Sequence, residues 1–125
     1  MKEIIATPNA PEAVGPYSQA VRYKDMLYLS GQIALDPETG QLERDSIATQ
    51  TRRCVENIKA VVTAAGGTME NVLKCTVFLS SMYHFAEMNA VYATYFADAP
   101  PARITVASAG IYDNLDVEID VVAGL

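Results

Sequence analysis

The sequence of 125 residues predicts an α+β fold in which one mixed β-sheet is covered on one face by two helices. Short apolar or alternating segments, which are typical of strands, occur near both ends of the chain. Between them lie two longer segments that carry apolar residues at helical spacing. The expected order is strands, helix, strand, helix, strands, with no repeat or linker. A chain of this length fits one domain, which we expect to span residues 1–125.

Three short strands are expected in the first third of the chain, over residues 3–6, 17–23 and 26–30. Prolines and a Gly-Pro pair separate the first strand from the second, and a Lys-Asp turn joins the second to the third. The sequence Asp-Pro-Glu-Thr-Gly at residues 36–40 is typical of a tight turn. This part of the chain is therefore expected to form the first strands of the sheet.

The segment after Asp45 and Ser46 predicts the first helix. Either residue can cap its amino-terminal end, and the glycine pair at residues 66–67 is an expected stop. Charged residues fall between the apolar positions, so one face of this helix should be polar and the other buried. The expected buried positions are Ile47, Thr51, Cys54, Val55, Ile58, Val61, Val62 and Ala65.

The second helix is expected after Ser80 or Ser81, either of which can cap it. It must end before the two prolines at residues 100–101, because proline and the residue before it do not continue a helix. Large apolar and aromatic residues recur at helical spacing within this segment. They are Phe85, Met88, Val91, Tyr92, Tyr95 and Phe96, and we interpret them as core residues.

Three further strands are expected over residues 72–79, 104–108 and 117–121. In the first, one face should carry Leu73, Cys75, Val77 and Leu79. In the last, Val117, Ile119 and Val121 should meet the helices. The opposite face of the sheet then stays uncovered and mixes polar with apolar residues, which is a natural surface for self-association.

Composition and charge exclude several classes of protein. No apolar run approaches the roughly 20 residues of a membrane-spanning helix, and the first residues show no secretory signal, so we expect a cytoplasmic protein without membrane contact. Nine Lys and Arg against fifteen Asp and Glu give a net charge of −6 without a basic stripe, which argues against nucleic acid as a partner. With one histidine, two distant cysteines and no phosphate-binding glycine loop, we expect neither a metal nor a nucleotide cofactor.

Two charged residues in apolar strands are the candidates for chemistry. Arg103 opens its strand directly after two prolines, and Glu118 interrupts the last strand. They could pair with each other across adjacent strands or point to water, as charged residues on half-exposed strands commonly do. Alternatively, the donor fork of Arg103 binds a substrate carboxylate while Glu118 orients or deprotonates a water. This second interpretation describes the hydration of a small carboxylated substrate.

Short motifs recur along the chain in an order and spacing that are typical of one family. They are Gly15-Pro16-Tyr17-Ser18-Gln19-Ala20, Ser30-Gly31-Gln32-Ile33, Asp36-Pro37 with Thr39-Gly40, Asn57 with Lys59-Ala60, Lys74 with Thr76-Val77-Phe78, Phe85-Ala86 with Asn89-Ala90, Pro101-Ala102-Arg103, and Val117-Glu118-Ile119. Each fragment alone is weak evidence, whereas together they cover almost the whole chain. On these motifs the chain resembles the reactive intermediate deaminase family, the Rid or YjgF proteins.

The resemblance implies a chorismate-mutase-like two-layer sandwich that assembles as a homotrimer, with an active site in each cleft between subunits. It also implies hydrolysis of reactive 2-enamine and 2-imine acids, such as 2-aminoacrylate and 2-iminobutanoate, to 2-oxo acids and ammonia without a cofactor. Pyridoxal-phosphate enzymes such as threonine or serine dehydratase release these intermediates. By position, Arg103 would hold the substrate carboxylate and Glu118 would place the attacking water. Tyr17 would pack against the ligand, and Gly31 and Asn89 would line the cleft.

The chain departs from the family pattern at two places. Many deaminase-type members carry a cysteine two residues after the arginine, where this chain has Thr105. The Thr105 hydroxyl can still donate to a carboxylate or hold a water, so we expect it to bind substrate and the activity to be retained. Residues 110–115 also differ from the usual family loop and are expected to form only a connection.

Two other functions stay open at this point. The same cleft could belong to a non-catalytic module that binds small carboxylates, for which Glu118 would be less needed than Arg103. Some relatives are credited with RNA cleavage or inhibition of translation. The acidic charge, the single histidine and the lack of a basic aromatic face argue against that activity here.

Overall fold

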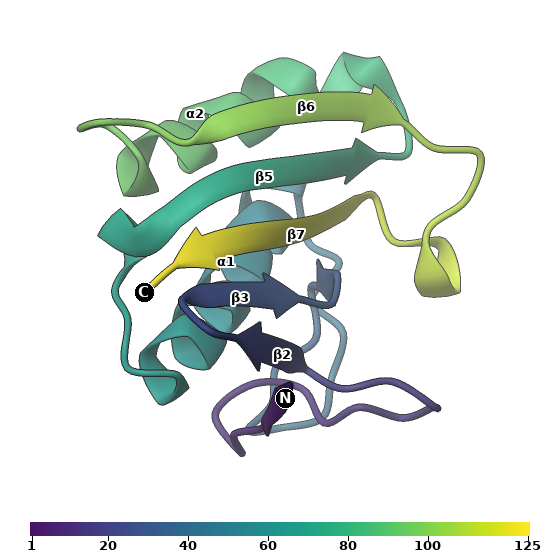
Figure 1. Ribbon diagram of the computed structural model, residues 1–125. Coiled ribbons are helices and arrows are strands. Elements are labelled where there is room, and N and C mark those ends of the chain that lie inside the picture. Colours follow the sequence, from purple (N-terminus) through teal and green to yellow (C-terminus); the bar gives the residue numbers. More distant parts are fainter.

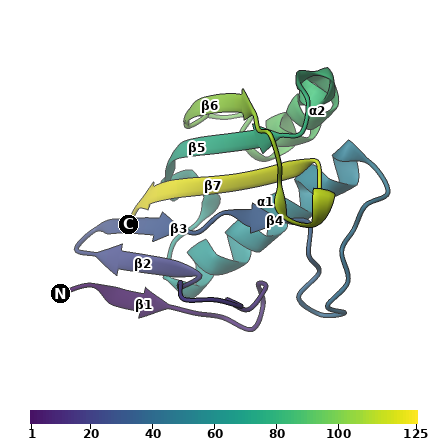
Figure 2. The ribbon, with the colours of Figure 1, turned by 90° about the vertical axis from the view of Figure 1, so that its right-hand side faces the viewer.

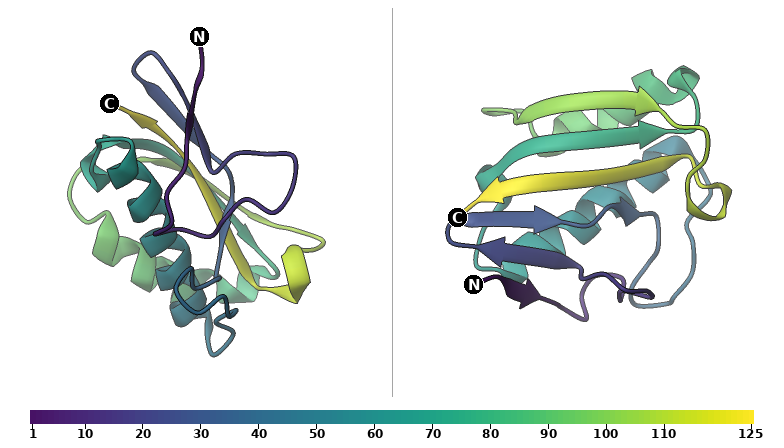
Figure 3. Two further views of the ribbon diagram at one scale, coloured as in Figure 1. Left: turned by 90° about the horizontal axis from the view of Figure 1, so that it is seen from below. Right: turned by 45° about the vertical axis from the view of Figure 1, so that its right-hand side comes forward.

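The computed structural model describes residues 1–125 and has the predicted architecture, a mixed sheet with both helices on one face (Figure 1). The strands are β1 (Glu3–Ile5), β2 (Ala20–Tyr23), β3 (Met26–Leu29), β4 (Gln32–Ile33), β5 (Val72–Leu79), β6 (Ala102–Ala107) and β7 (Val117–Gly124). The helices are α1 (Ile47–Ala64) and α2 (Phe85–Tyr95), with short 3-10 segments η1 (Met69–Asn71), η2 (Met82–His84) and η3 (Tyr112–Asn114). Seen from below, the helices lie on one side of the sheet and leave the other side uncovered (Figure 3).

The sheet has the strand order β1-β2-β3-β7-β5-β6, and β4 pairs with β7 beyond the end of β3 (Figure 2). β5 and β6 are parallel, because α2 crosses over between them, while the other neighbouring strands are antiparallel. The last strand of the chain is therefore inserted into the middle of the sheet. Its alternation is as predicted, since Val117, Ile119 and Val121 are buried against the helices.

One face assignment in the sequence analysis is wrong. Leu73 was expected to share the buried face of β5 with Cys75, but its side chain is 51% exposed and Val72 is buried instead. The pairing of β5 with β7 shifts register between Val72 and Lys74, which is the signature of a β-bulge. An extra residue in one strand moves the preceding side chains to the other face, and the alternation of the sequence does not reveal such an insertion.

Several strand boundaries also differ from the predictions. The strand expected from Tyr17 begins at Ala20, because residues 15–18 form a turn in which the Tyr17 amide donates to the Gly15 carbonyl at 2.8 Å. β1 ends at Ile5, one residue early, and β6 begins two residues earlier than expected. β7 continues to Gly124, so it runs beside β5 for nearly its whole length.

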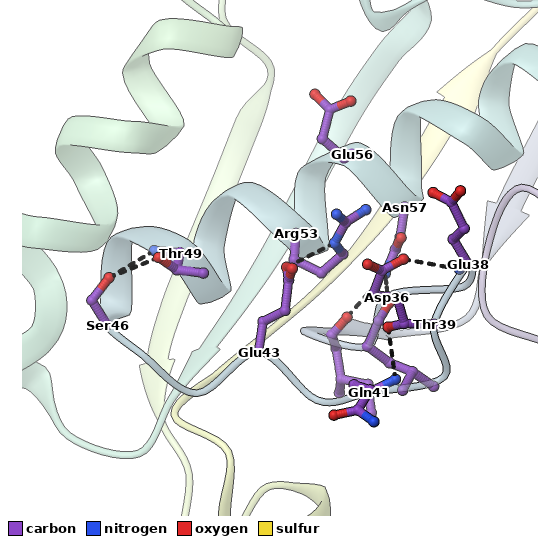
Figure 4. A network of polar contacts seen from close by, with 12 residues as sticks. Asp36, Glu38, Thr39, Gln41, Glu43, Ser46, Thr49, Arg53, Glu56 and Asn57 are labelled. Atoms are coloured by element: carbon purple, nitrogen blue, oxygen red, sulfur yellow. Dashed lines mark hydrogen bonds and ion pairs between the residues drawn. The ribbon is translucent and has the colours of Figure 1, made fainter.

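Helix α1 begins where its sequence predicts. The side chain of Ser46 caps the helix by accepting from the Thr49 amide at 3.0 Å (Figure 4). In the same region Arg53 Nε donates to Glu43 Oε1 at 2.9 Å, which ties the helix to the loop that leads into it. The preceding turn is closed by Asp36, whose carbonyl accepts from the Gly40 amide at 2.8 Å. These local contacts link the start of α1 to the loop and turn that precede it.

A buried amide connects α1 to the short strand β4. Asn57 is fully buried, and its side-chain nitrogen donates to the carbonyls of Ile33 at 3.1 Å and Leu35 at 2.9 Å. Since β4 has only two residues, it makes few ladder hydrogen bonds of its own. The Asn57 side chain thus fixes the backbone of a segment that also lines the cavity described below.

Helix α2 packs beside α1 on the same face of the sheet (Figure 1). Met88, Val91, Tyr92 and Phe96 are buried as predicted, while Phe85 and Tyr95 are partly buried against the core. Cys54 in α1 and Cys75 in β5 are both buried and free, as expected for small core residues. Neither α1 nor α2 combines the length and the apolar composition that crossing a bilayer requires.

The uncovered face of the sheet carries exposed apolar side chains. Ile104 and Val106 of β6 point to it, and so does Tyr28 of β3. Ile104 is 50% exposed and lies on β6, the edge strand next to β5. The predicted mixture of polar and apolar residues on this face is confirmed, because Glu118 and Asp120 of β7 share it.

We expect the substitution Ser46→Ala to lower the free energy of unfolding by about 1 kcal/mol, the usual cost of losing a side-chain cap. The Thr49 amide would lose its acceptor at the start of α1. Urea denaturation at a fixed protein concentration measures the change. Ser46→Asp keeps an acceptor at the same place and should stay close to the parent protein. Equal losses in both variants would contradict the capping role.

Candidate functional site

Arg103 and Glu118 lie on opposite faces of the sheet, and β5 separates the strands that carry them. Arg103 pairs with Cys75 in the register, and Cys75 pairs with Val121 of β7. Cys75 and Val121 are buried beneath the helices, so Arg103 points to the helix-covered side. Glu118 is three positions from Val121 along β7 and points to the uncovered side. The two charged residues therefore do not pair with each other, contrary to one of the sequence-based interpretations.

The guanidinium of Arg103 lies against one face of α2. Arg103 Nη1 donates to Asn89 Oδ1 at 2.8 Å. The guanidinium carbon lies 5.5 Å from the ring centroid of Phe85 and 4.7 Å from that of Tyr92. Phe85, Asn89 and Tyr92 are spaced four and three residues apart and share one face of the helix. Asn89, which the sequence could place only on a helix, is thus beside Arg103.

No carboxylate of the chain forms an ion pair with Arg103. Its single side-chain hydrogen bond is the one to Asn89, which leaves most of the five guanidinium donors free. A half-buried arginine without a counter-ion is suited to an anionic ligand, and its planar fork matches a carboxylate. This environment fits the predicted role of Arg103 as a carboxylate anchor.

Thr105 lies two residues after Arg103 in β6 and points to the same side of the sheet. Its hydroxyl oxygen is buried and has no hydrogen-bond partner within the chain. Buried polar atoms are nearly always satisfied, so an unpartnered hydroxyl next to an unpaired arginine is unusual. The hydroxyl is free to bond a water or a ligand atom.

Glu118 lines a cavity of about 430 Å³ on the other side. Its walls come from the loop before β2, from residues 30–35 around β4, and from η3. The volume lies within the range of small-molecule sites. The lining residues are Pro11, Glu12, Val14, Tyr17, Gln19, Ser30, Gly31, Gln32, Ile33, Leu35, Tyr112 and Glu118. Tyr17 and Gly31, both predicted from the sequence, thus share one cavity with Glu118.

Gly31 is in direct contact with the Glu118 carboxylate. A Cβ atom at residue 31 would overlap Glu118 Oε2. The glycine therefore allows the carboxylate to lie against the backbone next to β4. In this position a larger residue would push the Glu118 side chain away from its place in the cavity. The predicted importance of Gly31 has a steric basis.

Burial raises the pKa of Glu118 from its ordinary value, and the neighbouring carboxylate of Asp120 raises it further. A carboxylate with a raised pKa accepts a proton more readily than an exposed one. At a pH above this raised pKa the carboxylate is ionised, and the ionised form is the one that a general base requires. The cavity thus contains one group suited to proton transfer.

Tyr17 forms the exposed wall of this cavity, with 52% of its surface accessible. The loop that carries it is held by the buried Gln19, whose side-chain oxygen accepts from the Thr7 amide at 2.6 Å and whose nitrogen donates to the Pro11 carbonyl at 2.8 Å. Ser30 Oγ donates to the Ser18 carbonyl at 2.6 Å and fixes the other end. A rigid loop thus presents an open aromatic face.

Sequence reasoning missed Tyr112. Residues 110–115 were expected to be only a connection, but Tyr112 of η3 lines the Glu118 cavity and is 65% exposed. The next two residues, Asp113 and Asn114, both have φ in the left-handed region, and Asp113 Oδ2 pairs with Arg44 Nη2 at 3.0 Å. The sequence did show a large aromatic residue in a loop that departs from the family pattern. That observation does not predict which cavity the ring lines.

The predicted site residues therefore form two groups. The first, the Arg103 half-site, consists of Arg103, Asn89 and Thr105 on the helix-covered side of the sheet. The second, the Glu118 half-site, consists of Glu118, Gly31 and Tyr17 on the other side. One can bind an anion and the other can accept a proton. A single chain does not bring the two groups together.

Comparisons with known proteins cover nearly the whole chain. A family model described as endoribonuclease L-PSP matches residues 7–125. A RutC family protein of Pyrococcus horikoshii is 46% identical over 123 residues, which are 98% of this chain and 98% of that protein. The 2-iminobutanoate/2-iminopropanoate deaminase of Mus musculus is 38% identical over 123 residues, which are 98% of this chain and 91% of that protein.

Solved structures agree with the sequence matches. The YjgF gene product of E. coli superposes with a TM-score of 0.94 at 38% identity, covering 98% of both chains. TdcF of E. coli, solved with bound serine, has a TM-score of 0.94 at 37% identity and covers 98% of both chains. These similarities extend over the sheet and both helices rather than over one part of the fold.

We expect Glu118→Gln to raise the melting temperature at neutral pH. Because the pKa of Glu118 is higher in the folded chain, its ionised form costs stability above that pKa, and the cost disappears as the pH falls below the unfolded value of about 4.3. Melting curves of both proteins should therefore diverge with rising pH and meet at acidic pH. Glu38→Gln, in the exposed turn before α1, is a control for removing one charge, because the Glu38 side chain makes no ion pair. The same difference in melting temperature between the parent protein and Glu118→Gln at every pH would contradict the raised pKa of Glu118.

Proposed function

Because the chain belongs to the endoribonuclease L-PSP family, which is the Rid or YjgF family, we propose that it is a deaminase of reactive 2-imine and 2-enamine acids. The substrates are small, such as 2-iminobutanoate and 2-aminoacrylate, and the products are 2-oxo acids and ammonia. The observation that carries the proposal is the pair of half-sites: an unpaired arginine for the carboxylate and a carboxylate of raised pKa for the water. The mouse relative is named for this reaction, and TdcF was solved with the amino acid serine bound.

Arg103 binds the substrate carboxylate through its free donors. Asn89 holds one donor of the guanidinium, and the remaining donors are available for a bidentate contact. The Thr105 hydroxyl, without a partner in the chain, donates to the same ligand or to a water beside it. The substitution of threonine for the usual cysteine keeps a hydrogen-bonding group at this position.

Glu118 acts as the base in the hydration step. A protonated imine is already an electrophile, so the reaction needs a positioned water rather than a metal or a cofactor. The water oxygen attacks the imine carbon while one of its protons passes to Glu118. Glu118 then returns this proton to the carbinolamine nitrogen. The C–N bond breaks and ammonia leaves while Glu118 takes the hydroxyl proton and the C=O bond of the 2-oxo acid forms. Ammonia removes the proton from Glu118 as ammonium, which restores the carboxylate. Tyr17 packs against the substrate, and Gly31 leaves space for the Glu118 carboxylate.

A second copy of the chain completes the site. The sheet lies between the two half-sites of one chain, so one small substrate does not contact both. We propose that the Arg103 half-site of one copy faces the Glu118 half-site of the next. Three copies related by a threefold axis close such head-to-tail contacts into a ring. The exposed Ile104, Val106 and Tyr28 of the uncovered face supply apolar surface for the contact.

The activity is tested by generating 2-iminobutanoate from threonine with a dehydratase and trapping the imine with semicarbazide. We expect the protein to divert imine from the trap. Arg103→Ala should raise KM, and Glu118→Gln should lower kcat by about 10²–10⁴-fold, the range for a lost general base. The acidic limb of the kcat/KM profile should have its midpoint above the ordinary glutamate pKa of about 4.3 and should disappear in Glu118→Gln.

Arg22→Ala is a control, because Arg22 lies on β2 outside both half-sites and its one side-chain hydrogen bond is to the Lys24 carbonyl. Full activity in both site variants would overturn the proposal. If the parent protein diverts no imine formed from threonine, serine or leucine but 2-oxo acids protect it from heat, the cleft belongs to a non-catalytic binding module. Cleavage of RNA by the parent but not by Glu118→Gln would assign the site to that other chemistry.

The shared site makes a separate prediction, that inactive variants complement each other. When Arg103→Ala and Glu118→Gln chains are co-expressed in equal amounts, about one quarter of the clefts in randomly mixed rings should contain both intact half-sites. Activity should therefore return to about one quarter of the parent level. The control is to mix the two variants after separate purification and to measure activity before their subunits exchange, when no ring contains both variants. Absence of any recovery in mixed assemblies would show that each chain carries a complete site.

A further inference from the structure

The Arg103 guanidinium is held mainly by aromatic rings. Within the chain it has one side-chain hydrogen bond, to Asn89 at 2.8 Å, and two ring faces within reach, Tyr92 at 4.7 Å and Phe85 at 5.5 Å from the guanidinium carbon. A cation within about 6 Å of a ring centroid is attracted by the negative face of the ring. The nearer ring, Tyr92, therefore provides the stronger of the two aromatic contacts.

Tyr92 is itself fixed in place by the core. It is 5% exposed, and its ring stacks at a tilt on Phe96 with centroids 4.6 Å apart. It belongs to the buried stripe of α2, which in turn packs on α1. Because the ring has little freedom, the guanidinium resting on it has a defined plane as well as a defined position. Asn89 alone would fix one donor and leave the plane free to rotate.

The hydroxyl of Tyr92 contributes little to this arrangement. It is buried next to the Cys75 thiol, and it makes no well-formed hydrogen bond in the chain. Burial raises the pKa of Tyr92, so the ring is neutral at physiological pH. The contact with Arg103 is therefore made by the ring face and not by a phenolate charge. Replacing tyrosine by phenylalanine should preserve it.

We propose that Tyr92 is a positioning residue, whose ring holds the guanidinium of Arg103 in the plane that a substrate carboxylate needs for bidentate binding. This inference rests on the proposed function in one respect, that Arg103 binds a carboxylate. A guanidinium fork binds bidentately only when its plane is aligned with that of the carboxylate. An anchor that is already oriented loses less conformational freedom on binding, so affinity is higher.

Two aliphatic variants, Tyr92→Leu and Tyr92→Met, remove the ring face, and Tyr92→Phe retains it. We expect both aliphatic variants to raise KM for 2-iminobutanoate, and Kd for 2-oxobutanoate, by about 5- to 30-fold, the range for a desolvated cation–π contact. kcat should change little, because Glu118 is untouched. Tyr92→Phe should stay within about 2-fold of the parent protein. Two aliphatic residues of different shape are used in case one of them prevents folding.

The control is Tyr95→Leu on the same helix. Tyr95 is partly buried like a core residue, but its hydroxyl donates to Glu56 and it makes no contact with Arg103. The substitution Tyr95→Leu should lower the melting temperature and leave KM and Kd unchanged. Suppose that the parent protein is active and that Tyr92→Leu, like Tyr95→Leu, lowers the melting temperature without changing Kd. Tyr92 is then only a core residue, and the inference is overturned while the proposed function stands.

A spectroscopic readout tests the inference without any ligand. The Hε signal of Arg103 should carry a ring-current shift in the parent protein and in Tyr92→Phe, and should lose it in Tyr92→Leu and Tyr92→Met. The Nη signals should be resolved in the first pair and averaged in the second, because the guanidinium rotates more freely without the ring. Identical Arg103 spectra in all variants would overturn the inference, even if the parent protein has no deaminase activity.

Discussion

The antiparallel pairing of β5 with β7 is the constraint on which the rest of the structure depends. These are the longest strands, and they lie next to each other in the middle of the sheet. Cys75, Val77 and Leu79 on one strand face the helices together with Val117, Ile119 and Val121 on the other, and all six are buried. Because side chains alternate along a strand, placing these residues in the core leaves the residues between them on the opposite face.

This alternation also determines where the functional groups lie. Glu118 is on the uncovered face because Val117 and Ile119 are in the core. Arg103 is on the helix-covered face because it is in register with Cys75. The same hydrophobic core that stabilises the chain thus separates the two charged residues. We propose that a second chain completes a site that uses both, and the exposed apolar residues of the uncovered face offer surface for that contact.

Residues of helix α2 contribute both to the hydrophobic core and to the surroundings of Arg103. Its buried stripe packs Tyr92 and Phe96 against α1 and the sheet, while Phe85, Asn89 and Tyr92 meet Arg103 along one side. Tyr92 belongs to both sets. The position that we propose for the Arg103 guanidinium therefore depends on the helix layer, in which the cap of α1 and the buried Asn57 tie α1 to its surroundings.

The sequence by itself determined the fold class, the approximate positions of both helices and the family, because helical periodicity and ordered motifs are local properties of the chain. The predicted cap was right for α1 but wrong for α2, since Ser81 caps η2 and α2 begins at Phe85 without a side-chain cap. It also singled out Arg103 and Glu118, since charged residues in apolar strands are visible in one dimension, whereas Gly31 and Asn89 were implied by the family motifs. Only the tertiary structure decided the bulge at Leu73, the separation of Arg103 from Glu118 by β5, the place of Tyr112 in the cavity and the ring contact of Tyr92. Each of these depends on strand order, register or the direction of a loop. They arise from contacts between residues far apart in the chain, which local patterns do not encode.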